Sequence, residues 1–340
     1  MKALLLEGGD KVGKHTATVG VIKTLIASNY RVLYTDFPQY WFFGNIIKHV
    51  LKQQSLNISN TKREIEVRCA LYAIDRLFSL INIIPYLNQD DVILVSDRGW
   101  VSNTLTISFG YCEKKISNSD VKNFMNTLSK WDEEFIEILK PLSLLLLTGK
   151  NGKNAIHKES QAQDDLYEND GPQKISTKLY KKYFHLKEIY TQNNGEWRNI
   201  NEIVKDILYC AKIPYLDSNT SVSPTVESLL KSESLIFVSP QILFPILYGK
   251  EWNNVSKQYG NSLNEIIKMS WIGDKEKLKK LEQNIFNIMI SYPPKEVYFK
   301  FPSIIVKGIK KHMSEYPEIN NLIKEVAGLK FYNYFSLLLT

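Results

Sequence analysis

Short, mainly apolar runs that lack regular alternation recur through the first half of the chain. They are Ala3–Leu6, Arg31–Tyr34, Asp91–Asp97 and Leu142–Leu147. Each run is too short for a typical helix, so each is predicted to be a buried strand. Between them, helical spacing recurs in Thr16–Ser28, Gly44–Gln53, Thr61–Leu87 and Val121–Leu139. Such strands, separated by helices, are typical of a parallel sheet covered on both faces, and they predict an α/β fold.

The last third of the chain has a different pattern. Residues 216–226 are rich in Ser, Thr and Asn and contain Pro224, which predicts a linker. Beyond it, helices are predicted from Asp274 to the Pro293–Pro294 pair and over residues 304–312 and 319–337. We therefore predict an α/β domain at 1–215 and a mainly helical region at 227–340. No chemical motif lies in that region, and its role stays open between packing on the first domain and binding an unidentified protein.

The segment that follows the first predicted strand has the G-x-x-x-x-G-K pattern of a phosphate-binding loop. Glycines allow several backbone N–H groups to face one oxyanion, and the next helix and Lys14 add positive charge. The predicted ATP-binding residues are Gly8, Gly9, Asp10, Lys11, Val12, Gly13, Lys14, His15 and Thr16. The position after the lysine usually carries a hydroxyl for magnesium, and neutral His15 is a poor ligand for that ion.

Ligands of parallel sheets bind beyond the carboxyl ends of the strands. That rule gathers the glycine loop, Asp36–Pro38, Asp97–Trp100 and the stretch after Thr148 at one edge. There, the Asp97 carboxylate can hold the waters of a magnesium ion, and the Arg98 guanidinium can bind a phosphate. The alternative is a simple ion pair at the end of the strand.

One predicted helix, VRCALYAIDRLFSL, carries Arg68, Tyr72 and Arg76 at intervals of four residues, so the three share a face. A ring flanked by two guanidinium groups can stack a base and bind its monophosphate. The alternative is a solvent-facing edge with Asp75 nearby.

Five segments together resemble the thymidylate kinases, P-loop enzymes that phosphorylate dTMP from ATP. They are EGGDKVGKHT, TDFP at 35–38, LYAIDR at 71–76, DRGWVS at 97–102 and LYEN at 166–169, in the family's order and spacing. The resemblance covers residues 1–213. It implies a three-layer P-loop NTPase fold, a phosphotransferase activity that gives dTDP for dTTP synthesis, and ATP and Mg²⁺ as donor and cofactor.

The resemblance also implies roles for single residues. Lys14 would bind the donor phosphates, Asp10 would contact the acceptor's sugar, and Lys11 occupies the position of an arginine that stabilises the transferring group. The other implied roles are thymine contact for Phe37 and Tyr72, monophosphate binding for Arg76 and Arg98, magnesium for Asp97, and a lid at 149–170 with Tyr167 reaching the acceptor. The catalytic candidates are thus Asp10, Lys11, Lys14, Asp97 and Arg98, and Arg68 joins the acceptor candidates by its spacing.

Several positions depart from the family pattern. They are His15 for the magnesium serine, Lys11 for arginine, Asp36 for a basic residue, Gly99 for an aromatic residue, and a lid with Lys150, Lys153 and Lys158 but no arginine. Lysine does not bind phosphate in the forked geometry of arginine. A catalytically impaired nucleotide-binding or scaffold protein derived from this fold is therefore the alternative function.

Composition narrows the partners. The net charge of +7 suits an anionic ligand, but no long Lys/Arg block indicates nucleic acid. The three cysteines lie far apart, and no segment reads as a signal peptide or a membrane span, so we expect a cytoplasmic protein without a membrane partner. Its expected partners are small-molecule nucleotides, with a homodimer left open.

Overall fold

The computed structural model describes most of the chain. It covers residues 1–9, 12–39, 42–53, 55–140, 142–149, 170–184, 186–193, 195–216, 228–229, 232–238, 247–253 and 275–340. Several predicted features lie outside these residues: Asp10, Lys11, the lid lysines, Tyr167, Asp274 and nearly all of the linker.

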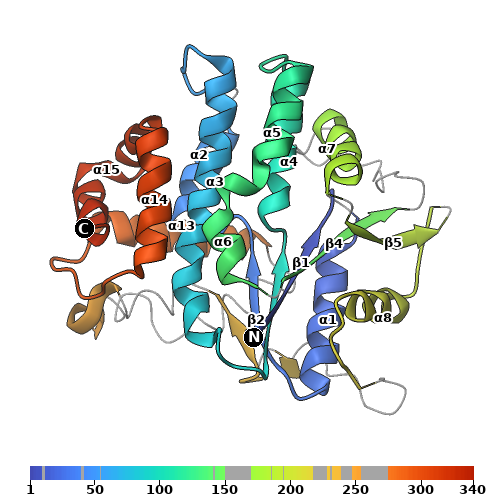
Figure 1. Ribbon diagram of the computed structural model, residues 1–340. Coiled ribbons are helices and arrows are strands. Elements are labelled where there is room, and N and C mark those ends of the chain that lie inside the picture. Colours follow the sequence, from blue (N-terminus) through green and yellow to red (C-terminus); the bar gives the residue numbers. More distant parts are fainter. Residues whose placement is uncertain are drawn as a thin grey trace.

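The described strands form one seven-stranded sheet with the order β6-β5-β4-β1-β3-β2-β7 (Figure 1). They are β1 (Lys2–Glu7), β2 (Arg31–Asp36), β3 (Val92–Asp97), β4 (Leu142–Gly149), β5 (Lys187–Asn193), β6 (Glu196–Trp197) and β7 (Leu235–Phe237). The pairs are parallel except for antiparallel β5–β6. Because β1 lies between β3 and β4, the loop after β1 is at the point where the strand order reverses, a usual ligand-binding place.

Helices flank this sheet in two layers. They are α1 (Lys14–Ala27), α2 (Phe43–Leu51), α3 (Thr61–Ile83), α4 (Asn103–Cys112), α5 (Asn118–Trp131), α6 (Glu133–Ile138), α7 (Asp170–Tyr183) and α8 (Ile200–Cys210), with short turns η1 (Ile84–Tyr86) and η2 (Trp100–Ser102). Helices α1 and α8 pack together, and α3, α4, α5 and α7 form the other group of contacts (Figure 1). A parallel sheet with a glycine loop between its central strand and a helix defines a P-loop NTPase-type α/β fold, as predicted.

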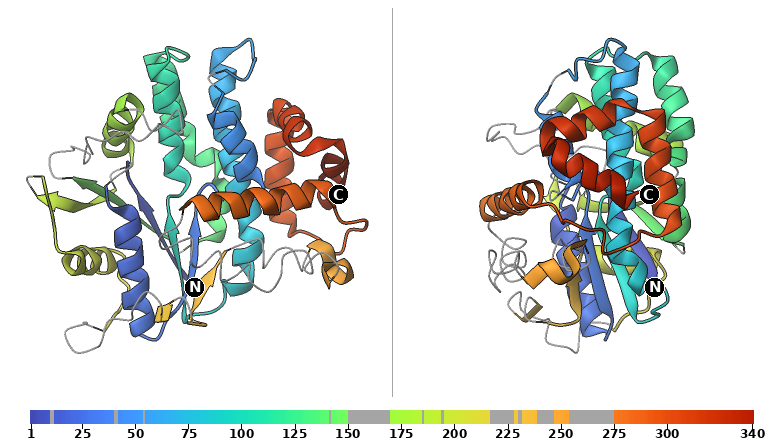
Figure 2. Two further views of the ribbon diagram at one scale, coloured as in Figure 1. Left: turned by 180° about the vertical axis from the view of Figure 1, so that it is seen from behind. Right: turned by 90° about the vertical axis from the view of Figure 1, so that its left-hand side faces the viewer.

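The end of the chain is mainly helical, as predicted. Its described elements include η5 (Gly249–Glu251), α13 (Lys275–Ser291), α14 (Ser303–Glu315) and α15 (Glu318–Leu338). Helix α14 packs along α3, and α15 packs against α2 and α3, so the late helices extend the helical layer of the first domain (Figure 2).

This late region also joins the sheet. Strand β7 pairs in parallel with β2, with Leu235 opposite Val32, and the Val32 N–H donates to the Ser234 carbonyl at 2.7 Å. One cluster of buried apolar side chains runs from β1 to α15. Whether residues 216–226 separate two domains stays a prediction, but the hydrophobic core is continuous across the described residues on either side.

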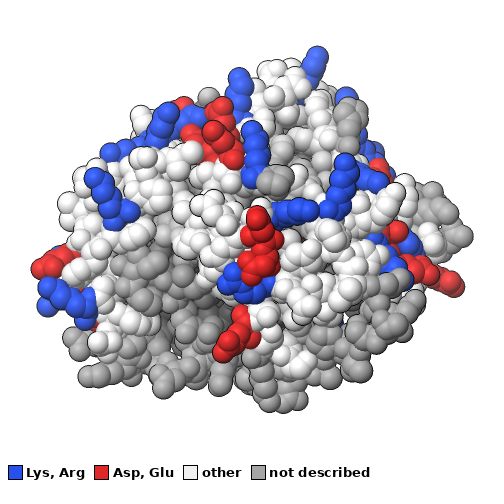
Figure 3. All heavy atoms as spheres, turned by 60° about the horizontal axis from the view of Figure 1, so that its bottom comes forward, with Lys and Arg blue, Asp and Glu red and all other residues white. Residues whose placement is uncertain are grey.

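The surface is mixed in charge. On the face in Figure 3, Lys and Arg side chains are interspersed with Asp and Glu. The three cysteines are free thiols. None of the helices in the described ranges combines the length and apolar character that crossing a bilayer requires.

Candidate functional site

The carboxyl ends of β1, β2, β3 and β4 meet at one edge of the sheet, because these strands run parallel. In the register, Asp97 at the end of β3 lies opposite Leu6 of β1 on one side and Asp36 of β2 on the other. The predicted gathering of the glycine loop, Asp36 and Asp97 is therefore confirmed.

Gly8 and Gly13, the two glycines of the G-x-x-x-x-G-K pattern, have backbone conformations that favour glycine. Gly8 has φ of +141° and Gly13, which precedes α1, has φ of +80°. A Cβ at Gly8 would lie 2.4 Å from the Leu147 carbonyl oxygen, so the loop passes directly over β4. Only a residue without a side chain fits there.

Lys14 is the first residue of α1, and its side chain folds back over the loop. Its Nζ donates to the Gly9 carbonyl at 2.6 Å, and the residue is only 7% exposed. An ammonium group held inside a curled loop at a helix N-terminus is suited to bind phosphate. His15 and Thr16 are exposed on the same turn.

Glu7 is a buried acidic residue next to the glycine loop, and sequence reasoning did not identify it. It is fully buried, and its Oε2 accepts from the Ser102 hydroxyl at 2.6 Å. Burial raises the pKa of Glu7, while the Ser102 hydrogen bond and the charges of Arg98, Arg76 and Lys14 act in the opposite direction. The charges of three cations that are predicted to bind nucleotide therefore act on this one carboxyl group.

Arg98 follows β3 in a left-handed conformation, with φ of +73°. Its N–H donates to the Leu6 carbonyl at 2.9 Å, which holds it against β1. A Cβ at the next residue, Gly99, would lie 2.3 Å from Leu5 Cδ2 and 3.1 Å from Glu7 Oε1. The backbone at Gly99 therefore packs closely against the side chains of β1.

Two carboxylates face each other across β2 and β3. Asp36 ends β2, and the surrounding protein desolvates its carboxyl group although part of its surface is exposed. That desolvation, followed by the charge of Asp97, raises the pKa of Asp36 to about 7.

Asp97 has the character expected of a magnesium ligand. Its Oδ1 is buried and has no hydrogen-bond partner within the described part of the chain. Hard carboxylate oxygens fit Mg²⁺, which usually keeps several of its waters. Among the described residues, no group of three or more His, Cys, Asp or Glu side chains is placed to hold a metal.

Helix α3 is surrounded on nearly all sides. From Val67 to Ile83, every residue is buried except Tyr72, which is partly exposed. The solvent-facing edge considered for this face is therefore wrong, and Tyr72 marks the place where α3 borders an opening. Asp75, considered part of that edge, is buried and accepts a hydrogen bond from the Gln39 N–H at 3.0 Å.

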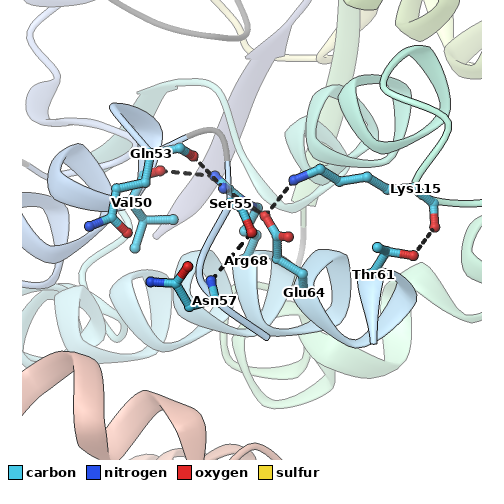
Figure 4. Close-up of polar contacts among 8 residues, drawn as sticks. All are labelled: Val50, Gln53, Ser55, Asn57, Thr61, Glu64, Arg68 and Lys115. Atoms are coloured by element: carbon cyan, nitrogen blue, oxygen red, sulfur yellow. Dashed lines mark hydrogen bonds and ion pairs between the residues drawn. The ribbon is translucent and has the colours of Figure 1, made fainter. Parts of the chain in front are cut away.

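Arg68 is held by protein groups on both sides (Figure 4). Its guanidinium donates to the Val50 and Gln53 carbonyls at 3.0 and 2.6 Å and pairs with Glu64 at 2.9 Å. Lys115 also binds Glu64, at 2.8 Å. These contacts tie the end of α2 to α3, and the acceptor role for Arg68 stays a prediction.

Arg76 forms a second buried pair. Its Nε and Nη2 donate to the two carboxylate oxygens of Asp132 at 2.6 and 2.9 Å, and both side chains are at most 1% exposed. A forked pair of this kind fixes the guanidinium plane. Asp132 was not identified from the sequence, because it lies far along the chain and carries no motif.

The remaining predicted residues lie at the same edge or outside the described residues. Phe37 is buried after β2, and its ring packs edge-on against Phe135 with centroids 5.7 Å apart. Asp10, Lys11 and Tyr167 are not among the described residues. Trp197, which sequence reasoning did not connect with the loop, is 50% exposed and lies beside Gly13.

Comparisons with known proteins give a distant likeness. No protein-family model and no curated protein matches the chain. Among solved structures, thymidylate kinase from Candida albicans is similar over 62% of this chain and 91% of its own, with 18% identity and a TM-score of 0.44. Values this low do not assign a family, and the fold assignment rests on the strand order and the glycine loop.

Proposed function

We propose that this chain is a nucleoside monophosphate kinase of the thymidylate type, which transfers the γ-phosphoryl group of ATP to dTMP. The observation that carries this proposal is that Lys14 and Arg98 donate to the Gly9 and Gly8 carbonyls of the glycine loop, while their charges and that of Arg76 act on buried Glu7 beside the loop. Cations gathered from three separate elements suit two phosphorylated ligands that meet at one edge of the sheet.

The donor binds at the loop. Backbone N–H groups, the N-terminus of α1 and the Lys14 ammonium neutralise the phosphates of ATP. Asp97 would hold Mg²⁺ through its waters, and the ion would supply further neutralisation of the phosphate charge.

The acceptor binds beside Tyr72, the partly exposed residue of α3. The Tyr72 ring stacks on thymine, and Arg98 and Arg76 bind the monophosphate. An acceptor phosphate oxygen forms a bond to the γ-phosphorus while the bond to the bridging oxygen breaks, giving dTDP and ADP. The protein contributes positioning, neutralisation of charge and exclusion of water by the predicted lid.

A coupled assay with ATP, Mg²⁺ and a panel of ribo- and deoxynucleoside monophosphates tests the proposal. We expect turnover with dTMP in preference to the other acceptors. Absence of turnover with every acceptor, by protein whose circular dichroism shows a folded chain, would contradict it.

A second candidate function is a catalytically impaired nucleotide-binding or scaffold protein. It is favoured by exposed His15, because the loop pattern expects at this position a side-chain hydroxyl that binds magnesium. This candidate predicts ATP binding that does not depend on Mg²⁺.

One variant separates the two candidate functions, and a second tests whether the loop binds nucleotide. His15→Ser should raise Mg²⁺-dependent turnover if the loop of an active kinase is only weakened. Lys14→Ala should abolish ATP binding, measured by calorimetry, under either function, so it reports whether the loop is the nucleotide site at all.

A further inference from the structure

Helix α14 of the C-terminal region inserts a histidine into the kinase-like core. His312 is fully buried, and its Nε2 lies 2.8 Å from the Trp131 carbonyl oxygen at the end of α5. A carbonyl oxygen only accepts hydrogen bonds, so Nε2 carries the proton. Burial lowers the pKa of His312, which keeps the ring neutral.

Two further contacts fix α14 at the same place. The Trp131 indole N–H donates to the Tyr316 hydroxyl at 3.1 Å. Gly308 lies so close to α3 that an added Cβ would be 2.9 Å from Leu77 Cδ1. Helix α14 therefore contacts both α3 and the junction between α5 and α6 (Figure 1).

The residue after Trp131 is the partner of Arg76. Asp132 is the N-cap of α6, is fully buried, and binds the Arg76 guanidinium with both carboxylate oxygens. The carbonyl that His312 binds belongs to the peptide that joins Trp131 to Asp132. Any rotation of that peptide moves the Asp132 backbone and, with it, the carboxylate that orients Arg76.

We propose that His312 is a positioning residue for the acceptor site, which acts through the Trp131–Asp132 peptide on the orientation of Arg76. The inference rests on the proposed function, because Arg76 is there assigned to the acceptor. This inference gives the C-terminal region a role, because α14 then stabilises the part of the proposed acceptor site that holds Arg76. Holding a long cationic side chain in place before the ligand arrives lowers the entropy cost of binding.

The test compares His312→Leu with His312→Gln in the full-length protein. Leucine removes the hydrogen bond to Trp131, whereas the glutamine amide can still donate. We expect His312→Leu to raise KM for dTMP about 10-fold with KM for ATP unchanged, and His312→Gln to recover most of the loss. Glu325→Gln, which removes an exposed contact between α15 and α2, is the control and should change neither constant.

A second measurement does not need activity. The Arg76 Nε–H, assigned in ¹⁵N-arginine-labelled protein by its loss in Arg76→Lys, should exchange slowly with solvent in the wild type. It should exchange faster in Asp132→Asn and His312→Leu, and slowly again in His312→Gln. An unchanged Arg76 signal in His312→Leu would overturn the inference.

The two readouts keep the inference separate from the proposed function. If no acceptor is turned over, the proposed function fails, and the Arg76 signal still decides the coupling to His312. If the signal changes while KM for dTMP does not, His312 positions Arg76 but Arg76 does not bind this acceptor.

Discussion

Asp36 is a residue whose charge changes near neutral pH. It lies opposite Asp97 at the edge of the sheet, and its pKa is raised to about 7. Near neutral pH, therefore, a negative charge appears or disappears at this edge.

The first prediction is a pH-dependent affinity for the acceptor. Above about pH 7 the ionised Asp36 repels the dianionic acceptor, so KM for dTMP should rise between pH 6 and pH 8.5. In Asp36→Asn the rise should be absent. The acceptor phosphate itself titrates at a pH of about 6 in both experiments. The quantity to compare is therefore the KM for dTMP of the wild type divided by the KM of Asp36→Asn at each pH.

The control for this prediction is Asp120→Asn. The Ser117 hydrogen bonds and Lys62 lower the pKa of Asp120 to about 2, so its charge is constant over the measured range. If the KM of the wild type divided by the KM of Asp36→Asn stays constant between pH 6 and pH 8.5, the prediction is contradicted.

The second prediction concerns stability and Asp75. Burial raises the pKa of Asp75 to about 7 in the folded protein, against 3.8 for the ordinary group. The protonated form is therefore favoured by folding, and this contribution is lost as the pH rises from about 4 through about 7. At pH 8, Asp75→Asn should raise the free energy of unfolding by about 1–3 kcal/mol, because no charge is buried and the amide oxygen can still accept from Gln39.

Urea unfolding at pH 4.5 and pH 8 checks this prediction, with Asp120→Asn for comparison. The Asp120 pKa is lowered by its Ser117 cap and by Lys62, so its loss should destabilise the protein at pH 8. If the two substitutions change the free energy of unfolding equally at pH 8, the ionised Asp75 carboxylate does not destabilise the folded protein and the prediction is contradicted.

Sequence reasoning at the residue scale works where topology alone decides the position. Asp97 and Arg98 could be placed because parallel strands end at a common edge. Glu7 and Asp132 could not, because their roles depend on contacts with Ser102 and Arg76 made only in the folded chain. The buried pair of Arg68 and Glu64 could not be predicted either, because its i,i+4 spacing is equally typical of an exposed helix face.

Among the elements, α2 and α3 depend on one another through Arg68. Its guanidinium donates to the Val50 carbonyl in the last turn of α2 and to the Gln53 carbonyl just after that helix. Glu64 balances its charge in a site that excludes water.

The third prediction is that Arg68→Met costs about 3 kcal/mol of folding free energy. The substitution removes a guanidinium that is buried against Glu64 and two carbonyls, and Glu64 keeps only Lys115 as its cation, a far larger penalty than loss of an exposed pair. Arg31→Met, which breaks an exposed pair with Asp91, is the matched control and should leave the urea midpoint nearly unchanged. Similar midpoint shifts for the two variants would contradict the prediction.

The predicted elements were those with a clear period or an uninterrupted apolar run. Helix α4 was not predicted, because residues 103–110 are all buried and a helix buried on every side has no amphipathic stripe. Strand β5 is mostly polar in sequence, and β7 has three residues, too few to show a period.

On the scale of the whole molecule, the late helices complete the core of the first domain. Phe42 and Phe43 at the start of α2 and Phe78 of α3 pack against Phe335 of α15, with ring centroids 5.4 to 6.3 Å apart. Because this aromatic cluster joins residues separated by more than half of the chain, its partners cannot be read from local sequence.

The fourth prediction is that the described parts unfold as one cooperative unit. Phe335 is fully buried, so Phe335→Ala should cost about 3–5 kcal/mol through lost burial and the cavity left behind. If the core is continuous, the urea midpoints from circular dichroism and from tryptophan fluorescence should fall together, with a single transition. If the helical region were an independent domain, unfolding would instead show two transitions, and Phe335→Ala would shift the urea midpoint of only one of them. Leu337→Ala, 56% exposed on the same helix, is the control and should change stability by less than about 0.5 kcal/mol.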